Sequence, residues 1–241
     1  MTIANKTVLV TGANRGIGLA LVNEALARGA KRVYAATRQS FTHDDVRVIP
    51  LAIDVTNEAQ IQQAFEQVDS LDVLINNAGI SLPDDLSDRA SLDRHLEVNV
   101  FGTYYMTKTF LPLLERSRGA IVNIVSIGAL AAVPILPSYS LSKAAAFSLS
   151  QSVRALLAAY GVSVHIVLPG PVDTDMVRAL DIPKESPQTV ARNIIDGVER
   201  GEEEIFPDPF SAMLAESWRG GAVKALERQN AALLVQSEAL A

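Results

Sequence analysis

The chain has 241 residues, a formal net charge of −6, 49% hydrophobic residues and no cysteine. Its length fits one large α/β domain, and the missing cysteine excludes disulfides, thiolate metal sites and cysteine nucleophiles. The three histidines lack metal-ligand spacing, so we expect no metal site. The acidic balance argues against a nucleic-acid partner, and the sequence shows neither a signal peptide nor a membrane-spanning run, so we expect a soluble cytoplasmic protein.

The chain opens with the pattern of a strand, a glycine turn and a helix. The β-branched run 6–10 is followed directly by TGANRGIG at 11–18, and then by apolar residues at helical spacing. Gly12, Gly16 and Gly18 would allow a phosphate to approach the backbone at the helix N-terminus. No Lys-Ser/Thr pair follows, so this is not the phosphate loop of an NTPase. An ordinary strand-to-helix turn is the alternative interpretation.

The end of the second predicted strand, 32–36, indicates which dinucleotide would bind. In dinucleotide-binding folds an acidic residue there holds the ribose 2′-hydroxyl, whereas arginine accommodates a 2′-phosphate. This strand ends in Thr37 and Arg38, and Arg15 lies in the glycine turn. Two guanidinium groups would thus surround a 2′-phosphate, which favours NADP over NAD. The alternative is a pair of solvated surface arginines.

Strands and helices continue to alternate, which is typical of a parallel sheet covered on both faces. We predict strands at 46–55, 71–75 and 120–125, a helix at 56–68 capped by Thr56, and a helical stretch at 88–114. That stretch contains Asn99 between apolar neighbours, and such an asparagine is either buried with partners or functional.

Ser126, Tyr139 and Lys143 predict the chemistry. Lys143 follows Tyr139 by four residues, so both side chains share one face of the predicted helix at 139–160. A neighbouring ammonium favours ionisation of a phenol, whose ordinary pKa is about 10, and the Ser126 hydroxyl could hold a substrate oxygen. Together they predict an acid/base site for a carbonyl and its alcohol. Alone, the Tyr-Lys spacing is weak evidence, because it also occurs on solvated helix faces.

The remaining predicted elements are a strand at 162–168, a small lid over the substrate at about 174–187, a helix at 187–200, an edge strand at 202–208 and a helical extension at about 211–241 broken at Gly220–Gly221. The charged triplet at 202–204 would be a solvated turn. We therefore expect one α/β domain over residues 1–241. Its fold would be a Rossmann-type doubly wound parallel sheet of about seven strands, with helices on both faces.

Motifs from residue 6 to about 198 resemble, in order and separation, those of short-chain dehydrogenases/reductases. They are TGANRGIG, NNAG at 76–79, Asn99, Ser126, the Tyr139/Lys143 pair and PGPVDT at 169–174. The resemblance implies that Tyr139 is the general acid/base, that Lys143 lowers its pKa and binds the nicotinamide ribose, that Ser126 donates to the substrate oxygen and that Asn99 anchors a proton-relay water.

The resemblance and the preceding arguments give one set of expected cofactor-binding residues. Asp54 and Val55 would contact adenine, 77–79 would form the cofactor-side wall, and Val172 and Thr174 would clamp the carboxamide. The full set is Gly12, Asn14, Arg15, Gly16, Ile17, Gly18, Thr37, Arg38, Asp54, Val55, Asn77, Ala78, Gly79, Tyr139, Lys143, Pro169, Val172 and Thr174.

We expect an NADP(H)-dependent oxidoreductase that interconverts a carbonyl and an alcohol, with reduction as the direction. The expected pocket residues are almost all apolar, which favours an uncharged, fairly apolar substrate. They are Leu82, Pro83, Leu130–Pro137, Met176, Val177 and Leu180. The alternatives are a non-catalytic NADP(H)-binding sensor or regulator and an NAD-dependent alcohol dehydrogenase of the same fold.

We expect the protein to be a homo-oligomer. The C-terminal end lacks the glycine-rich ending that many tetrameric relatives use to pair subunits. A homodimer through the helices at 88–114 and 139–160 is therefore as consistent with the sequence as a homotetramer.

Overall fold

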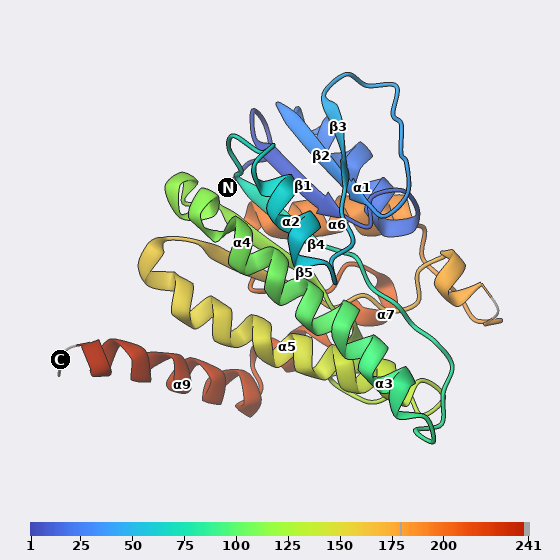
Figure 1. The fold of residues 1–241 in the computed structure, drawn as a ribbon. Coiled ribbons are helices and arrows are strands. Elements are labelled where there is room, and N and C mark those ends of the chain that lie inside the picture. The colour runs from blue at the N-terminus through green and yellow to red at the C-terminus, as the bar shows by residue number, and fades with distance from the viewer. Residues whose placement is uncertain (179, 239–241) are drawn as a thin grey trace.

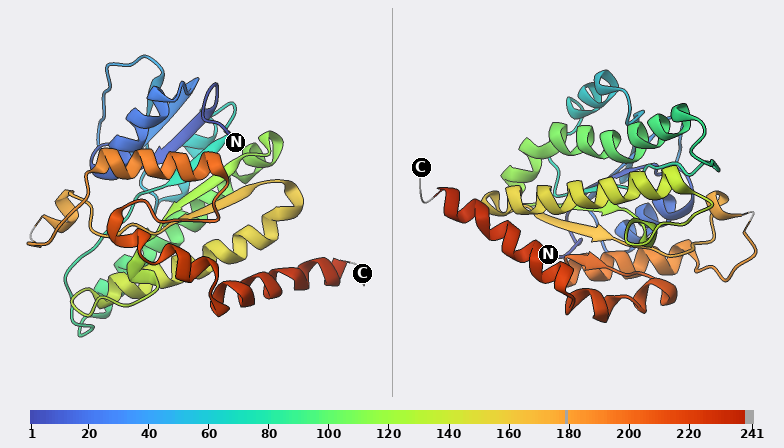
Figure 2. Two further views of the ribbon diagram at one scale, coloured as in Figure 1. Left: turned by 180° about the vertical axis from the view of Figure 1, so that it is seen from behind. Right: turned by 90° about the horizontal axis from the view of Figure 1, so that it is seen from below.

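The computed structural model places a seven-stranded parallel sheet between two layers of helices (Figures 1 and 2). It describes residues 1–178 and 180–238. The strands are β1 Thr7–Thr11, β2 Arg32–Thr37, β3 Val48–Ala52, β4 Val73–Asn76, β5 Ala120–Ile124, β6 Ser163–Val167 and β7 Glu204–Ile205. The α-helices are α1 Gly16–Ala27, α2 Glu58–Phe65, α3 Arg89–Leu96, α4 Gly102–Ser117, α5 Pro137–Leu157, α6 Pro187–Arg200, α7 Pro209–Ala212, α8 Ala215–Arg219 and α9 Ala222–Glu238. The predicted Rossmann-type sheet is confirmed.

Each face of the sheet has its own hydrophobic core, because successive strand residues point to opposite faces. Val8 and Val10 of β1 belong to the core under α1 and α6, whereas Leu9 belongs to the core under α2 and α4. The view from below shows α4 and α5 on one side of the strands and α1 and α6 on the other (Figure 2). Burial on both faces explains why the strand sequences are so apolar.

The strand order is β3-β2-β1-β4-β5-β6-β7, so the chain reverses its direction of sheet growth between β1 and β4. In open α/β sheets a ligand crevice forms at such a reversal, beyond the carboxyl ends of the strands. The glycine turn follows β1, Asn77 follows β4 and Ser126 follows β5. The fold therefore brings three motifs, far apart in the sequence, to one edge.

The helical stretch predicted at 88–114 is confirmed, but its winding changes at Asn99. α3 passes into a π-helical turn, Glu97–Phe101, and then into α4. Such turns are rare and often occur at functional sites, and no sequence pattern predicted this one. The expected cap of α2 was wrong. Asn57 accepts from the backbone N–H of Gln60 at 3.1 Å, while the Thr56 hydroxyl bonds Asp54 at 2.8 Å instead.

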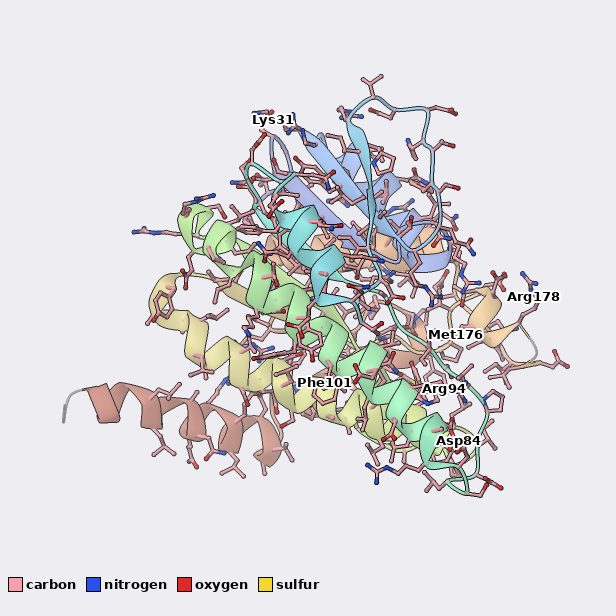
Figure 3. The ribbon with its side chains drawn as sticks, in the orientation of Figure 1. Lys31, Asp84, Arg94, Phe101, Met176 and Arg178 are labelled. Carbon is pink, nitrogen blue, oxygen red and sulfur yellow. The ribbon has the colours of Figure 1, made fainter. Side chains whose placement is uncertain are left out.

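The predicted lid at 174–187 is largely irregular chain around one short 3₁₀ turn, Asp175–Val177. Met176 and Arg178 project from it at one edge of the molecule (Figure 3). A bridge between Val172 and Glu185 closes its base. Ala179, part of the predicted lid, lies outside the described residues.

The C-terminal extension is helical, and its predicted break at 220–221 separates α8 from α9. Residues 239–241 of the predicted extension lie outside the described part of the chain. In Figure 1, α9 runs beside α5 and away from the rest of the domain. Within the described residues no helix is both long and apolar enough to cross a membrane.

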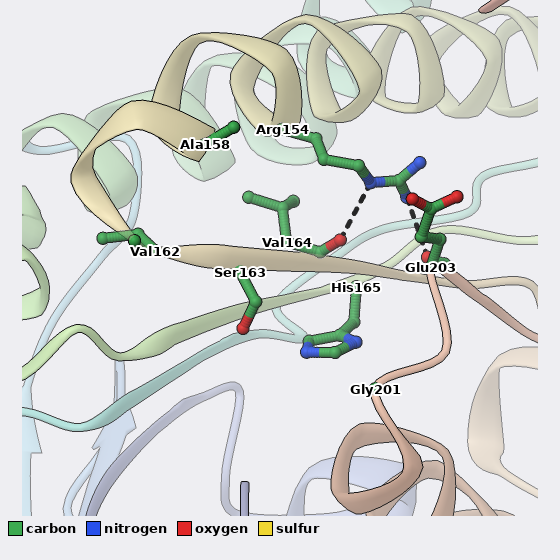
Figure 4. A pocket seen from close by; sticks show the side chains of 9 residues that line it. Arg154, Ala158, Val162, Ser163, Val164, His165, Gly201 and Glu203 are labelled. Atoms are coloured by element: carbon green, nitrogen blue, oxygen red, sulfur yellow. Dashed lines mark hydrogen bonds between the residues drawn. The ribbon is translucent and has the colours of Figure 1, made fainter. Parts of the chain in front are cut away.

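The prediction of a solvated turn at 202–204 was wrong for Glu204, which lies in β7 and is 4% exposed. Its carboxylate lies 2.7 Å from Arg154 of α5 and 2.9 Å from Lys224 of α9. Arg154 also donates to the carbonyl oxygens of Val164 and Glu203, beside a surface cavity (Figure 4). The cations that pair with Glu204 are 50 and 20 residues away, so the local sequence could not indicate them.

Replacing Lys224 with Met tests this buried network. Lys224 is 2% exposed and contacts Glu203, Glu204 and Glu227 at 2.8, 2.9 and 2.7 Å. Its loss would leave buried carboxylate charge poorly compensated, so we expect the free energy of unfolding to fall by about 3–5 kcal/mol. Urea denaturation measures this, with exposed Lys31→Met as the control, expected within about 0.5 kcal/mol of wild type. Equal stability of the two variants would contradict the assignment.

Candidate active site

A cavity of about 980 Å³ opens at the carboxyl ends of the strands. Every residue expected to bind a cofactor lines it, and so does Ser126. The cavity also has lining residues that the sequence did not single out, because most carry no motif. They are Leu19, Ala20, Asn23, Gln39, Ile53, Ile80, Val98, Ile124, Val125, Gly170, Asp173, Asp175, Pro187 and Gln188.

The glycine turn has a shape that side chains would disrupt. Gly12 and Gly16 have φ values of +64° and +54°, in the left-handed region that favours glycine. A Cβ on Gly18 would clash with the carbonyl oxygen of Gly12. α1 begins at this turn, and its N-cap residue, Arg15, makes no side-chain cap. Its first backbone N–H groups therefore suit an anion.

Both arginines of the expected 2′-phosphate site line the cavity, but their contacts differ. Arg15 donates to Asp175 of the predicted lid at 3.0 Å, an ion pair that the sequence did not predict. Arg38 is exposed and has no hydrogen-bond or ion-pair partner within residues 1–178 and 180–238. Arg38 is therefore free to bind an anion, whereas Arg15 would have to exchange its partner.

Tyr139 and Lys143 share one face of α5, as their spacing predicted. Lys143 Nζ lies 5.7 Å from the centre of the Tyr139 ring and donates to the carbonyl oxygen of Ile124 at 2.9 Å. Ser126 follows β5 and lines the same cavity as Tyr139 and Lys143. A serine hydroxyl, a phenol and an ammonium thus meet at one wall of the cavity.

Asn99 does not line the cavity but lies directly behind it. Its side chain accepts from the N–H of Ile80 at 2.8 Å and donates to the carbonyl oxygen of Ile80 at 3.0 Å and to Ser142 at 2.9 Å. A Cβ on Gly79 would lie 3.2 Å from the Asn99 amide oxygen and 3.6 Å from Lys143 Nζ. Asn99 is therefore buried, fully bonded and adjacent to the catalytic candidates.

The expected substrate residues divide into two groups. Met176 and Val177 of the predicted lid line the cavity. Leu82, Pro83, Leu130–Pro137 and Leu180 are not among its lining residues. In the part of the chain that the structure describes, no three His, Asp or Glu side chains gather as metal ligands.

The comparisons with known proteins agree on one family. The family model for short chain dehydrogenases matches residues 6–185. The chain belongs to the short-chain dehydrogenase family. A short chain dehydrogenase from Burkholderia cenocepacia J2315, solved in complex with NADP, is 35% identical with a TM-score of 0.87, covering 95% of this chain and 98% of that one.

Two curated relatives of this short-chain dehydrogenase are equally similar in sequence. An uncharacterised oxidoreductase of Staphylococcus aureus (strain USA300) is 33% identical over 211 residues, which cover 80% of this chain and 90% of the relative. Short-chain dehydrogenase/reductase 3 of Bos taurus is 33% identical over 222 residues, covering 82% of this chain and 73% of the relative. The chain is thus an oxidoreductase of this family.

Burial controls the protonation of the two key groups in this short-chain dehydrogenase. It raises the pKa of Tyr139 above its ordinary value, although the neighbouring Ser126 hydroxyl acts in the opposite direction. Burial also lowers the pKa of Lys143 to about 8. The expected lowering of the phenol pKa by Lys143 is absent from this structure. The ammonium lies over the ring and bonds a backbone carbonyl oxygen instead.

Replacing Lys143 with Met tests the lowered pKa without relying on activity. The folded protein holds the Lys143 proton less tightly than the unfolded chain, whose lysine pKa is 10.5. Wild type should therefore gain stability relative to Lys143→Met as the pH rises from about 8 to about 10.5, by up to about 3 kcal/mol. Urea denaturation at about pH 7 and pH 10 measures the difference. A difference that does not change with pH would contradict the lowered pKa.

Proposed function

We propose that this short-chain dehydrogenase is an NADP(H)-dependent oxidoreductase that interconverts a carbonyl and an alcohol on a small, fairly apolar substrate. The observation that carries the proposal is the meeting of Ser126, Tyr139 and Lys143 at a cavity whose other end holds the glycine turn. The relative solved with NADP supports the choice of cofactor.

The residues present fit this cofactor. The glycine turn lines the cavity at the N-terminus of α1, so the backbone N–H groups there can face a diphosphate. Arg38 offers an unpaired guanidinium where a 2′-phosphate is expected, and no acidic residue replaces it at the end of β2. Bound NADPH would supply the hydride.

The chain's own residues would handle the proton. Because its pKa is raised, Tyr139 keeps its proton at neutral pH and is suited to donate it to a carbonyl oxygen. Ser126 would hold that oxygen as negative charge develops on it. Lys143, with a pKa of about 8, is mostly an ammonium at neutral pH, and its bond to the Ile124 carbonyl oxygen holds it over the Tyr139 ring. With a proton on Tyr139 and a hydride supplied by NADPH, reduction is the direction that we propose.

Four apolar side chains of an otherwise largely polar cavity support an apolar substrate. Ile80, Val98, Met176 and Val177 contribute apolar side chains to the cavity, and Met176 is itself exposed at the rim. Apolar side chains at a binding site contact the apolar part of a ligand, and polar groups fix its orientation. An uncharged ketone, aldehyde or alcohol is therefore the proposed substrate class.

We also propose a cytoplasmic homo-oligomer. Phe101 and Tyr104 near the start of α4, together with Leu141 and Leu156 of α5, are large apolar side chains exposed on the two long helices. A two-fold axis through these helices would bury them in a self-complementary interface. This supports a homodimer, and a homotetramer would need a second surface.

Replacing Tyr139 with Phe separates an enzyme from a sensor on the same fold. Loss of the general acid should lower turnover of carbonyl substrates about 10²- to 10⁴-fold while NADPH affinity stays unchanged. A carbonyl panel under NADPH and a fluorescence titration measure the two quantities, with exposed Tyr160→Phe as the control. Unchanged turnover would contradict the role of Tyr139. Tight NADPH binding by wild type without turnover of any carbonyl would favour the sensor.

Replacing both Arg15 and Arg38 with Ala tests the cofactor preference. Loss of the charged hydrogen bonds to a 2′-phosphate should weaken NADPH binding by at least about tenfold and leave NADH binding unchanged. Fluorescence titration with both cofactors measures this, and exposed Arg89→Ala of α3 is the control. Equal binding of NADPH and NADH by wild type would show that these arginines are surface charges only.

A further inference from the structure

The loop 80–86 joins the cofactor side of the cavity to the N-terminal end of α5. It starts at Ile80, which lines the cavity, and it has no helix or strand. Without a backbone ladder its position depends on the side chains that bond it. Asp84 of this loop lies at the end of the molecule where α3 begins (Figure 3).

Three polar side chains with little or no exposure hold alternate residues of this loop. Asn99 bonds both backbone groups of Ile80. His95 accepts the N–H of Leu82 at 3.0 Å, and the Ser138 hydroxyl donates to the Asp84 carboxylate at 2.9 Å. Ser138 directly precedes Tyr139, so the loop is bonded at one end behind Gly79 and at the other beside the proposed acid.

The histidine among these three is held in one tautomer by its partners. His95 is 0% exposed, and its Nδ1 lies 2.7 Å from the carbonyl oxygen of Ser91. A carbonyl oxygen only accepts and a backbone N–H only donates, so Nδ1 carries the proton and Nε2 is the acceptor for Leu82. Both ring nitrogens of His95 are therefore hydrogen-bonded, Nδ1 as the donor and Nε2 as the acceptor.

An apolar side chain would fill the same volume without desolvating two ring nitrogens. The contribution specific to histidine is thus the acceptor that it offers to Leu82. His95 also precedes Asn99 by one helical turn, so the two side chains lie on the same side of their helix and hold neighbouring parts of one loop. With an apolar residue at position 95, the Leu82 N–H would lose the acceptor that His95 Nε2 provides.

We propose that His95 is a positioning residue for substrate: it fixes the loop 80–86 and thereby Ile80, the residue of this loop that lines the cavity. This inference rests on the proposed function. His95 does not line the cavity, so it acts through the loop and touches neither substrate nor cofactor. A small displacement of a positioning element is enough to weaken substrate binding while leaving cofactor binding intact.

A pair of substitutions separates the two bonds of His95. In His95→Gln the side-chain oxygen reaches the place of Nε2 and accepts from Leu82, but the bond to Ser91 is lost. In His95→Asn the amide stays near the place of Nδ1 and donates to Ser91, but nothing reaches Leu82. The control is Asp93→Asn, which introduces the same residue at an exposed site of the same helix.

Two readouts are compared across these variants. Hydrogen exchange, followed on a peptide spanning 80–86 in the absence of substrate, should accelerate roughly tenfold in His95→Asn and stay near wild type in His95→Gln and Asp93→Asn. The KM for a carbonyl substrate should rise roughly tenfold in His95→Asn only, with kcat and NADPH affinity little changed. Thermal unfolding verifies that all three variants are folded.

The outcomes are distinct. Equal hydrogen exchange in His95→Gln and His95→Asn would contradict the proposal that the bond from Leu82 to His95 holds the loop. Faster exchange in His95→Asn without a change in KM would contradict the role of His95 in substrate positioning. If wild type turns over no carbonyl, the proposed function fails and the substrate role fails with it. The exchange experiment still decides whether His95 holds the loop, because it needs no turnover.

Discussion

The junction between β1 and β4 is the constraint on which the rest of the site depends. The Thr11 hydroxyl accepts from the N–H groups of Asn77 and Ala78 at 2.9 and 3.0 Å, and the Asn77 amide donates back to Thr11 and Gly12. These bonds hold the glycine turn against the chain that follows β4, so close that Gly18 has no space for a Cβ. Both halves of the cavity are thereby fixed to each other before any ligand arrives.

From this junction further polar contacts extend to α5, which carries Tyr139 and Lys143. Asn77 leads through Gly79 to the loop bonded by Asn99, and Asn99 also bonds Ser142, which lies on α5 between Tyr139 and Lys143. In a low-dielectric interior such connected bonds are strong and leave few alternative arrangements. The dinucleotide end and the acid/base end of the cavity therefore share one continuous polar framework.

The sequence predicted most of the fold because strand, turn and helix patterns are local. For the same reason the sequence located the glycine turn, the Tyr139/Lys143 pair and the end of β2. The structure brings all three to one cavity. The sequence missed the π-helical turn at Asn99, the ion pair of Arg15 with Asp175 and the burial of Glu204. Each depends on residues brought together only by folding, and an apolar lining residue such as Val98 has no motif at all.

The contacts of Arg154 also bear on how readily the protein aggregates through the edges of its sheet. An open parallel sheet ends in two edges, and an exposed edge is a template for pairing with another chain. β7 is only two residues long, so it leaves part of β6 without a neighbouring strand. There the guanidinium of Arg154 donates to the carbonyl oxygen of Val164, which a longer β7 would otherwise have bonded. On the opposite edge, β3 carries Pro50, which has no N–H to donate. Both ends of the sheet thus resist edge-to-edge aggregation.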